Sequence, residues 1–253
     1  MSPAIQAGLD SDILHRQGRT RQSNYVRITC VKADPVLVLA SSSPRRKELL
    51  GLCGWEFDVR PADVDERPLP GEAPGEYVLR LSQSKARACA VRAAESPVIL
   101  AADTAVVVDD DILGKPRSED EAVEMLRRLR GRTHQVATGL AVLRSSDGKM
   151  VTDLCVTDVP MRAYREKEIE SYLASRDPLD KAGAYAIQHP GFHPVRKLRG
   201  CYASVMGLPL CHLVRTLRKL EVAPLSDVPA NCQAALHYRC PISSAVLRGE
   251  AIG

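Results

Sequence analysis

The first residues whose types could bind a ligand or take part in catalysis form a serine-rich turn, 41–43, followed by Pro44, Arg45 and Arg46. A serine before a proline is typical of the cap and first position of a helix. Backbone N–H groups and the helix dipole attract anions at such a start. Two arginines oppose that dipole unless they share an external anion with the backbone. We therefore predict a phosphate site here, with an ordinary capped helix and solvated arginines as the alternative.

A second feature is an acidic residue in apolar surroundings. Asp103, followed by Thr104, separates the apolar segments 98–102 and 105–108. A carboxylate there costs free energy unless it is hydrogen-bonded, paired or bound to a metal, so Asp103 at a strand end is a candidate metal ligand or general base. An Asx-type turn is the alternative. A further acidic cluster in a loop comprises Asp63, Asp65 and Glu66. With the arginines, these acids could hold a divalent cation and phosphates, or they could form a solvated loop.

Two lysines and an amide complete the set. Lys85 lies in the middle of the apolar stripe of a helix expected over 76–94, where it either extends its ammonium group to solvent or faces a site. Lys115 stands between glycine and proline, a setting typical of turns. The segment 180–188 combines small residues with Gln188, whose amide offers a donor and an acceptor and suits a pyrimidine edge. A tight helix-to-strand connection explains the same segment equally well.

The histidines and cysteines do not predict a zinc site. His189 and His193 are four residues apart, but the prolines and glycine around them exclude the helix that would bring both to one face. The eight cysteines include no pair two or three residues apart, so we expect reduced thiols.

The elements that must position these residues alternate between short apolar runs and amphipathic stretches, which predicts an α/β architecture with a mixed sheet. Strands are expected at 36–40, 98–102, 105–108, 133–144 and 151–163, with a hairpin turn at 145–148. Besides the two helices named above, helices are expected after the Ser118 cap, where Gly131 ends the helix, and over 166–174 and 208–220.

Composition excludes several classes of protein. The net charge is +4 over 253 residues, with the charges scattered, which argues against a protein that coats nucleic acid. Only 4% of the residues are aromatic, too few for base-stacking platforms. No apolar run approaches the roughly 20 residues that span a bilayer, and none near the start has secretory character. We expect a cytoplasmic protein with no membrane partner.

Length predicts one main domain. The first 34 residues mix polar and charged types, so 1–34 is expected to be a flexible N-terminal extension and 35–220 the domain. Prolines at 224, 229 and 241 interrupt the pattern beyond residue 220, so 221–253 is expected to be a C-terminal tail.

Taken together, the chain resembles the Maf family of nucleoside triphosphate pyrophosphatases from about residue 36 to 220. The resemblance is carried, in order, by residues 39–46, 64–66, 84–86, 102–104, 114–116, 131–134, 181–188 and 207–210. It implies cleavage of a nucleoside triphosphate to the monophosphate and pyrophosphate with Mg²⁺ or Mn²⁺. It also implies an elongated, ITPase-like α/β domain with a mixed sheet and a central cleft between two lobes.

The resemblance also implies roles. Glu66 and Asp103 would hold the metal, and Asp103 would orient or deprotonate the water that attacks the α-phosphorus, with Lys85 completing the catalytic group. The phosphates would be bound by Ser42, Ser43, Arg46 and Lys115.

Base recognition would rest on Arg45, Thr104 and Gln188, where the branch of the family acting on 7-methyl-GTP has Trp, Glu and Glu. The chain is therefore similar to the branch acting on dTTP and UTP. One departure is His189, where the family usually has glycine; its side chain either narrows the base pocket or swings away.

Two other activities fit the resemblance: a house-cleaning pyrophosphatase for modified pyrimidine nucleotides, and a nucleotide-binding regulator of cell division. The expected partner is a nucleoside triphosphate, without a stable nucleic-acid partner. A homodimer stays open.

Overall fold

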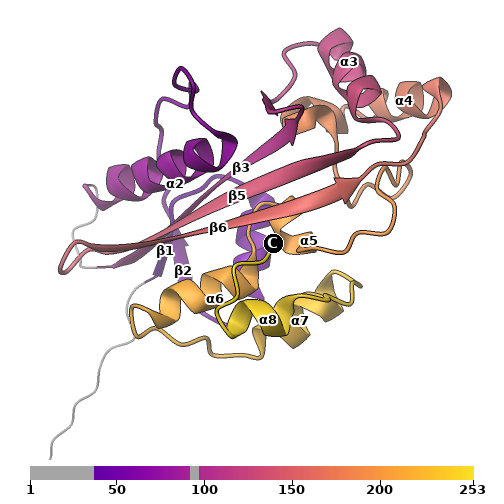
Figure 1. The fold of residues 1–253 in the computed structure, drawn as a ribbon. Helices are drawn as coiled ribbons and strands as arrows, with labels where there is room; N and C mark the ends of the chain where they lie inside the picture. Colours follow the sequence, from indigo (N-terminus) through magenta and orange to yellow (C-terminus); the bar gives the residue numbers. More distant parts are fainter. Residues whose placement is uncertain (1–36, 92–96) are drawn as a thin grey trace, which may run out of the picture. The chain divides into compact units, whose positions relative to one another are not determined.

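The computed structural model describes residues 37–91 and 97–253, so the expected N-terminal extension lies outside the described residues. Six strands of the described chain form one mixed sheet in the order β2-β1-β3-β5-β6, with β4 paired to β3 (Figure 1). The strands are β1 (Leu37–Leu39), β2 (Phe57–Val59), β3 (Val98–Val108), β4 (Asp111–Leu113), β5 (Thr133–Arg144) and β6 (Lys149–Pro160). This confirms the predicted α/β class and the mixed sheet.

The long strands follow from their sequence pattern. Residues of β3 are buried on both faces, which explains its nearly continuous apolar run. β1 pairs with β3 in parallel, while β3, β5 and β6 pair antiparallel. The last two are joined by the expected turn at residues 145–148.

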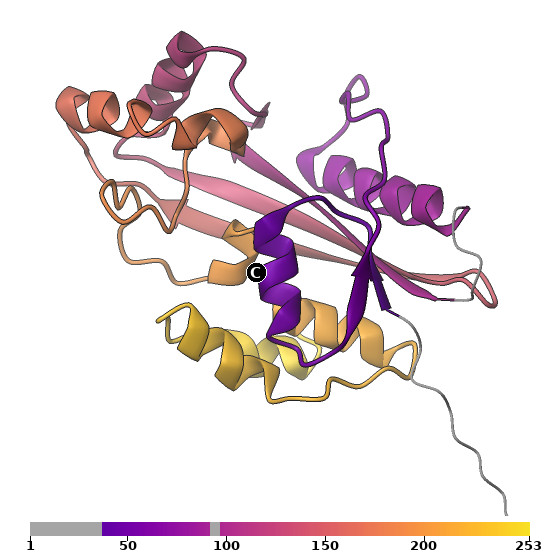
Figure 2. The ribbon, with the colours of Figure 1, turned by 180° about the vertical axis from the view of Figure 1, so that it is seen from behind.

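Helices cover both faces of the sheet. Helix α2 (Pro74–Ala90) lies on one face, where Ala86 and Cys89 pack with Val38 and Ile99. Figure 2 shows the opposite face, which is covered by α1 (Pro44–Gly51) and, beside it, α6 (Leu210–Arg218). The short helix α5 (Tyr202–Val205) contacts β5 and β6.

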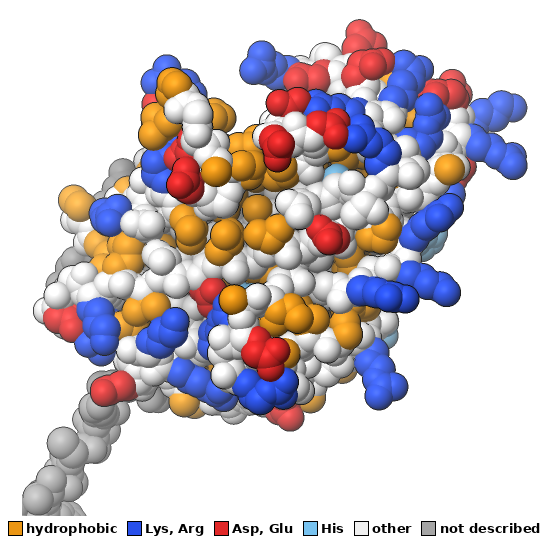
Figure 3. Space-filling model, viewed as in Figure 1, with side chains coloured by type: hydrophobic (Ala, Val, Ile, Leu, Met, Phe, Trp, Pro, Cys, Tyr) orange, Lys and Arg blue, Asp and Glu red, His pale blue; other side chains and the backbone are white. Residues whose placement is uncertain are grey.

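A second core forms at the far end of the long strands. Val106, Val136 and Val159 pack there against α3 (Glu119–Leu129) and α4 (Glu166–Leu173). The outer surfaces of these two helices carry acidic and basic side chains close together, as Figure 3 shows. Ion pairs such as Arg127–Glu166 join them. This core is separate from the one beneath α1 and α6.

The expectation that Asp103 lies at a strand end is wrong, because Asp103 lies in the middle of β3. The backbone ladder to β5 runs unbroken through Asp103, opposite Gly139, and Thr104, opposite Thr138. On its other edge, β3 pairs with β1 only at residues 98–100 and with β4 only at 106–108. The segment between these pairings therefore leaves room for a cleft.

The segment 221–253 was expected to be a C-terminal tail, but in the structure it is folded onto the domain. It contains α7 (Val228–Ala235) and α8 (Ser243–Leu247), and both contact α6. Val228, Ile242 and Val246 are buried in the core beneath them. Pro229 occupies the first turn of α7, where a proline is compatible with a helix. The prolines thus mark helix starts and turns, not an unpacked tail.

Among the described residues, we find no helix with the length and apolar character needed to cross a membrane.

Candidate active site

A single cleft of about 800 Å³ collects the residues that the sequence singled out. Its lining includes Ser42, Ser43, Arg45, Arg46, Glu66, Lys85, Asp103, Thr104, Lys115 and Gln188. The structure therefore brings together all the predicted site residues, which come from segments more than 140 positions apart in the chain. Their roles stay predictions.

The first wall of the cleft is the start of α1. Ser43 caps the helix and accepts the N–H of Arg46 at 3.5 Å. Ser41, a buried residue of the predicted serine-rich turn to which the sequence assigned no role of its own, accepts the Ser43 N–H at 3.2 Å and the Nη1–H of Arg46 at 3.3 Å. The serine run thus organises both the helix start and the arginine side chain.

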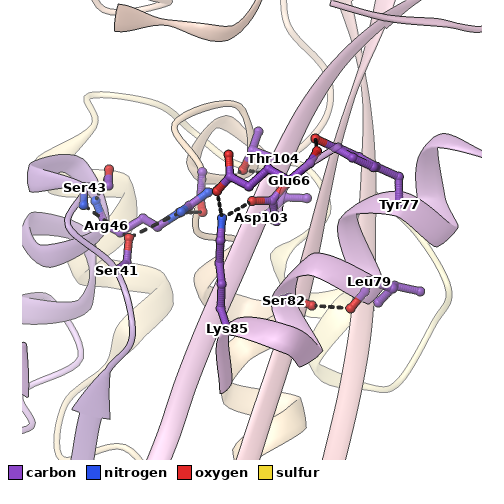
Figure 4. A network of polar contacts seen from close by, with 12 residues as sticks. Ser41, Ser43, Arg46, Glu66, Tyr77, Leu79, Ser82, Lys85, Asp103 and Thr104 are labelled. Carbon is purple, nitrogen blue, oxygen red and sulfur yellow. Dashed lines mark hydrogen bonds and ion pairs between the residues drawn. The ribbon is translucent and has the colours of Figure 1, made fainter. Parts of the chain in front are cut away.

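Arg46 is held by neutral oxygen atoms. Its Nε donates to the carbonyl of Gly207 at 2.9 Å and its Nη2 to Oγ1 of Thr104 at 3.1 Å, in addition to the Ser41 contact (Figure 4). These bonds use three of the five guanidinium N–H groups. Burial lowers the pKa of Arg46, and Asp103 opposes that effect. A desolvated guanidinium whose other two N–H groups are still available as donors is suited to binding a phosphate.

Gly207 is required at its position by the backbone. Its φ is +108°, and a Cβ atom there would lie 3.3 Å from both Nε of Arg46 and Oγ1 of Thr104. Thr104 in turn bonds Thr138 at 3.0 Å, and Thr138 donates to the carbonyl of Ser204. This chain of bonds fixes the floor of the cleft between β3, β5 and α5.

Of the two alternatives for Lys85, the structure shows that its ammonium group faces the site and does not extend to solvent. Its Nζ lies 2.6 Å from Oδ1 of Asp103 and 2.6 Å from Oε1 of Glu66 (Figure 4). Lys85 and Asp103 are buried, whereas 61% of the Glu66 side chain is exposed. The hydroxyl of Tyr77 donates to the carbonyl of Glu66 at 2.9 Å and so holds the loop over α2.

Burial raises the pKa of Asp103, although Lys85 and Arg46 act in the opposite direction. A carboxylate with a raised pKa is a better proton acceptor than an ordinary one. The hydrogen bond from Lys85 keeps the ionised group oriented. Asp103 therefore has the environment of a general base.

The same carboxylates fit a divalent cation that arrives with phosphates. Glu66 and Asp103 converge on one point, the Nζ of Lys85. Within residues 37–91 and 97–253, no group of three or more His, Cys, Asp or Glu is placed to hold a metal ion. Mg²⁺ is commonly bound by one or two protein carboxylates, with phosphates and water as the other ligands. The donor set matches that pattern.

The opposite wall is the segment from Asp177 to His189. Lys181 is buried, and its Nζ lies 2.8 Å from a carboxylate oxygen of Asp177 and 2.6 Å from one of Asp180. The Gly183 N–H donates to the carbonyl of Gly114 at 3.0 Å, which joins this wall to the turn of Lys115. Gln188 and Lys115 thus line the cleft from a wall that internal bonds hold in place.

A protein-family model described as Maf-like protein matches residues 36–220, about three quarters of the chain. The chain belongs to the Maf family. The match includes every residue of the cleft named above and ends two residues after α6, so α7 and α8 lie outside the Maf match.

Curated Maf relatives are similar over nearly their whole length. A dTTP/UTP pyrophosphatase of Anaeromyxobacter dehalogenans (strain 2CP-C) is 49% identical over 73% of this chain and 94% of the relative. The protein of the same name from Geobacter sp. (strain M21) is 48% identical, over 72% and 94%. That from Geobacter sulfurreducens is also 48% identical, over 73% and 96%.

Two solved structures also align with the chain. A nucleoside-triphosphatase / dITP/XTP pyrophosphatase of Mycobacterium abscessus is 13% identical over 73% of this chain and 97% of that one, with a TM-score of 0.37. The Ham1 protein of Staphylococcus aureus is 14% identical over 79% and 97%, with a TM-score of 0.39. At these scores the alignments establish no common fold.

Sequence reasoning missed the part that several residues play in this Maf site. Ser41 was recognised as part of the serine-rich turn, but its bond to Arg46 was not predicted. Tyr77 lines the cleft, but nothing local separates it from ordinary surface residues, and Lys181 lies in the predicted segment 180–188 without a role assigned to it. Thr138 acts from β5 through Thr104, a pairing that only the sheet register reveals.

Proposed function

We propose that this chain is a dTTP and UTP pyrophosphatase, which hydrolyses these nucleotides to the monophosphate and pyrophosphate. The observation that carries the proposal is the buried Lys85–Asp103 pair, with Glu66 on the same ammonium group and the Arg46 guanidinium in the same cleft. Membership of the Maf family and the names of the relatives support the reaction and the substrates.

Phosphate binding is assigned to the start of α1 and its surroundings. The backbone of Ser42 and Ser43, the remaining N–H groups of Arg46 and the ammonium group of Lys115 would hold phosphate oxygens. Phosphoryl-type transfer depends mainly on positioning and on neutralising charge. The same groups therefore stabilise the pyrophosphate as it leaves.

We assign to Asp103 the role of activating the attacking water. Its carboxylate accepts the proton of the water that attacks the α-phosphorus, while Lys85 holds it ionised and oriented. Glu66 and Asp103 would also hold Mg²⁺ or Mn²⁺, which when bound supplies charge neutralisation to the phosphate oxygens. Lys85, between both carboxylates, keeps them from repelling each other before a cation binds.

Base recognition is assigned to Arg45, Thr104 and Gln188. All three line the cleft, and Thr104 also contacts Arg46, so the base site adjoins the phosphate site. Changing these residues to Trp, Glu and Glu should shift the preference from dTTP towards 7-methyl-GTP. An unchanged preference would remove this assignment.

The experiment that tests the function measures pyrophosphate release from a panel of nucleotides with Mg²⁺ or Mn²⁺. We expect turnover of dTTP and UTP, and a loss of about 10²- to 10⁴-fold in Asp103→Asn, the usual contribution of a general base. Binding without turnover would favour a regulator, and a strong preference for pyrimidines with modifications that neither dTTP nor UTP carries would favour house-cleaning. Normal turnover in Asp103→Asn would overturn the catalytic assignment. We propose the cytoplasm, where these nucleotides are made, as the site of action.

A further inference from the structure

His189 lines the same cleft as its neighbour Gln188. Nδ1 of the His189 imidazole accepts two backbone hydrogen bonds, from the N–H of Gly191 at 3.3 Å and from that of Phe192 at 3.0 Å. The side chain therefore folds back over the turn that follows it and caps that turn. The ring is therefore held against residues 191 and 192 within a residue that lines the cleft.

Aromatic neighbours fix the plane of the ring. The His189 ring lies edge-on to Tyr172, with 4.7 Å between the centroids, and Tyr172 stacks on Phe192 at 4.4 Å. Tyr172 is itself held, because its hydroxyl donates to Asp177 and accepts the Ala186 N–H. The imidazole is thus oriented before a ligand binds, and this reduces the conformational entropy that is lost on binding.

The hydrogen bonds also place the ring proton. Two N–H donors directed at Nδ1 make this atom an acceptor, so the neutral imidazole carries its proton on Nε2. In the described chain, Nε2 has no hydrogen-bond partner, and it does not belong to the fully buried side-chain atoms that lack one. His189 is half-buried. His189, which follows Gln188 in the lining of the cleft, therefore carries an oriented N–H donor with no partner among the described residues.

We propose that His189 determines specificity by donating its Nε2–H to a ring carbonyl of the uracil or thymine base, a role that rests on the proposed function. The edge of such a ring presents two carbonyl acceptors on either side of an N–H donor. The amide of Gln188 can pair with the N–H and one carbonyl. The second carbonyl then needs a separate donor, which His189 supplies from the next position in the chain.

Two substitutions separate this role from the capping of the turn. Asparagine in His189→Asn keeps an acceptor near the position of Nδ1 but offers no donor near that of Nε2. Glutamine in His189→Gln extends an amide N–H towards the position of Nε2 but gives up the capping acceptor. His193→Asn is the matched control, because His193 is exposed and does not line the cleft.

The experiment measures kcat/KM for UTP, 2-thio-UTP and 4-thio-UTP, the dissociation constant of UMP by calorimetry, and the melting temperature of each variant. Sulfur accepts hydrogen bonds more weakly than oxygen. Wild type should therefore favour UTP over one thio analogue, and His189→Asn should lose that preference. His189→Asn should also lose about five- to tenfold in UMP affinity, the usual effect of one neutral hydrogen bond, with an unchanged melting temperature. His189→Gln should recover part of the affinity.

The outcomes distinguish the two proposals. Wild type that fails to release pyrophosphate from UTP and dTTP overturns the proposed function and this inference with it. Turnover by wild type, with His189→Asn keeping both the UMP affinity and the oxygen-to-sulfur preference, overturns this inference alone. A loss of affinity with an unchanged oxygen-to-sulfur preference and a lower melting temperature assigns His189 to turn capping and equally rejects the proposed contact. His193→Asn should match wild type throughout.

Discussion

Replacing Lys85 with methionine should make the stability of the protein depend on pH in a way that reports on Asp103. Lys85 Nζ lies 2.6 Å from a carboxylate oxygen of Asp103 and the same distance from one of Glu66. Without this cation, burial and the nearby Glu66 both favour the protonated form of Asp103, and only Arg46 opposes them. In the Lys85→Met variant the pKa of Asp103 should therefore rise further than in wild type, so that the folded protein keeps the neutral acid to a higher pH.

The size of the effect follows from the proton taken up. In the unfolded chain an aspartate ionises at a pKa near 3.9, about three units below pH 7. Holding it neutral at pH 7 costs ~1.4 kcal/mol for each of those units, or ~4 kcal/mol in total. This is an upper value, because methionine also removes the desolvation cost of the buried ammonium. It agrees with the ~3–5 kcal/mol typical of a broken buried ion pair.

The sign of the pH dependence is fixed by the direction of the shift. The folded pKa of Asp103 in Lys85→Met lies above the unfolded value, so the destabilisation is absent below about pH 4 and grows as the pH rises towards the folded pKa. Urea unfolding of wild type and variant at pH 5 and pH 7 should show a difference that is larger at pH 7, with ~2.7 kcal/mol as the ceiling for one proton over two pH units.

The matched control is the double variant Lys85→Met with Asp103→Asn, whose amide cannot take up a proton. Its stability relative to Asp103→Asn should be nearly independent of pH. A pH-independent loss in Lys85→Met, or the same slope in the double variant, would refute the assignment of the coupling to Asp103.

Three further results are expected. First, kcat/KM for pyrophosphate release should fall at acidic pH with an apparent pKa above the ~4 of an ordinary carboxyl, because burial raises the pKa of the proposed base, Asp103; an acid limb at or below pH 4 would contradict this. Second, Gly207→Ala should cost ~1–3 kcal/mol in denaturant unfolding and raise KM severalfold, because φ at this residue is +108° and the new Cβ would lie 3.3 Å from Nε of Arg46; unchanged values would argue against this role. Third, Arg215→Met should cost ~1–3 kcal/mol in unfolding but leave the activity per folded molecule intact, because Arg215 pairs with the half-buried Asp153 outside the cleft; a loss of kcat alone would count against it.

The sequence was sufficient for the parts of the site with local signals. Ser43 before a proline predicted the helix start that the structure shows at α1. Lys85 on the apolar stripe of a helix, Asp103 between apolar segments and Glu66 in an acidic loop marked the three charges that meet at the Lys85 ammonium group. The strands on either side of the turn at 145–148 were predicted for the same reason, because each has a clear apolar pattern.

Other parts depend on contacts between distant segments. The polar pair Asp103-Thr104 resembled the end of a strand, but backbone groups continue the ladder to β5 whatever the side chains are. Gly207 supports Arg46 from 161 positions away, so no local pattern reveals it. The prolines after residue 220 indicated a tail, whereas tertiary burial of Val228 and Val246 folds this segment onto α6.

The most direct test of the central claim follows oxygen from water into the products. UTP or dTTP is hydrolysed in ¹⁸O-labelled water by the wild-type protein, and the masses of the products are measured by mass spectrometry. Attack on the α-phosphorus by a water that Asp103 orients predicts one ¹⁸O atom in the monophosphate and none in the pyrophosphate. Label in the pyrophosphate, or a nucleoside diphosphate with labelled phosphate as the products, would contradict the account.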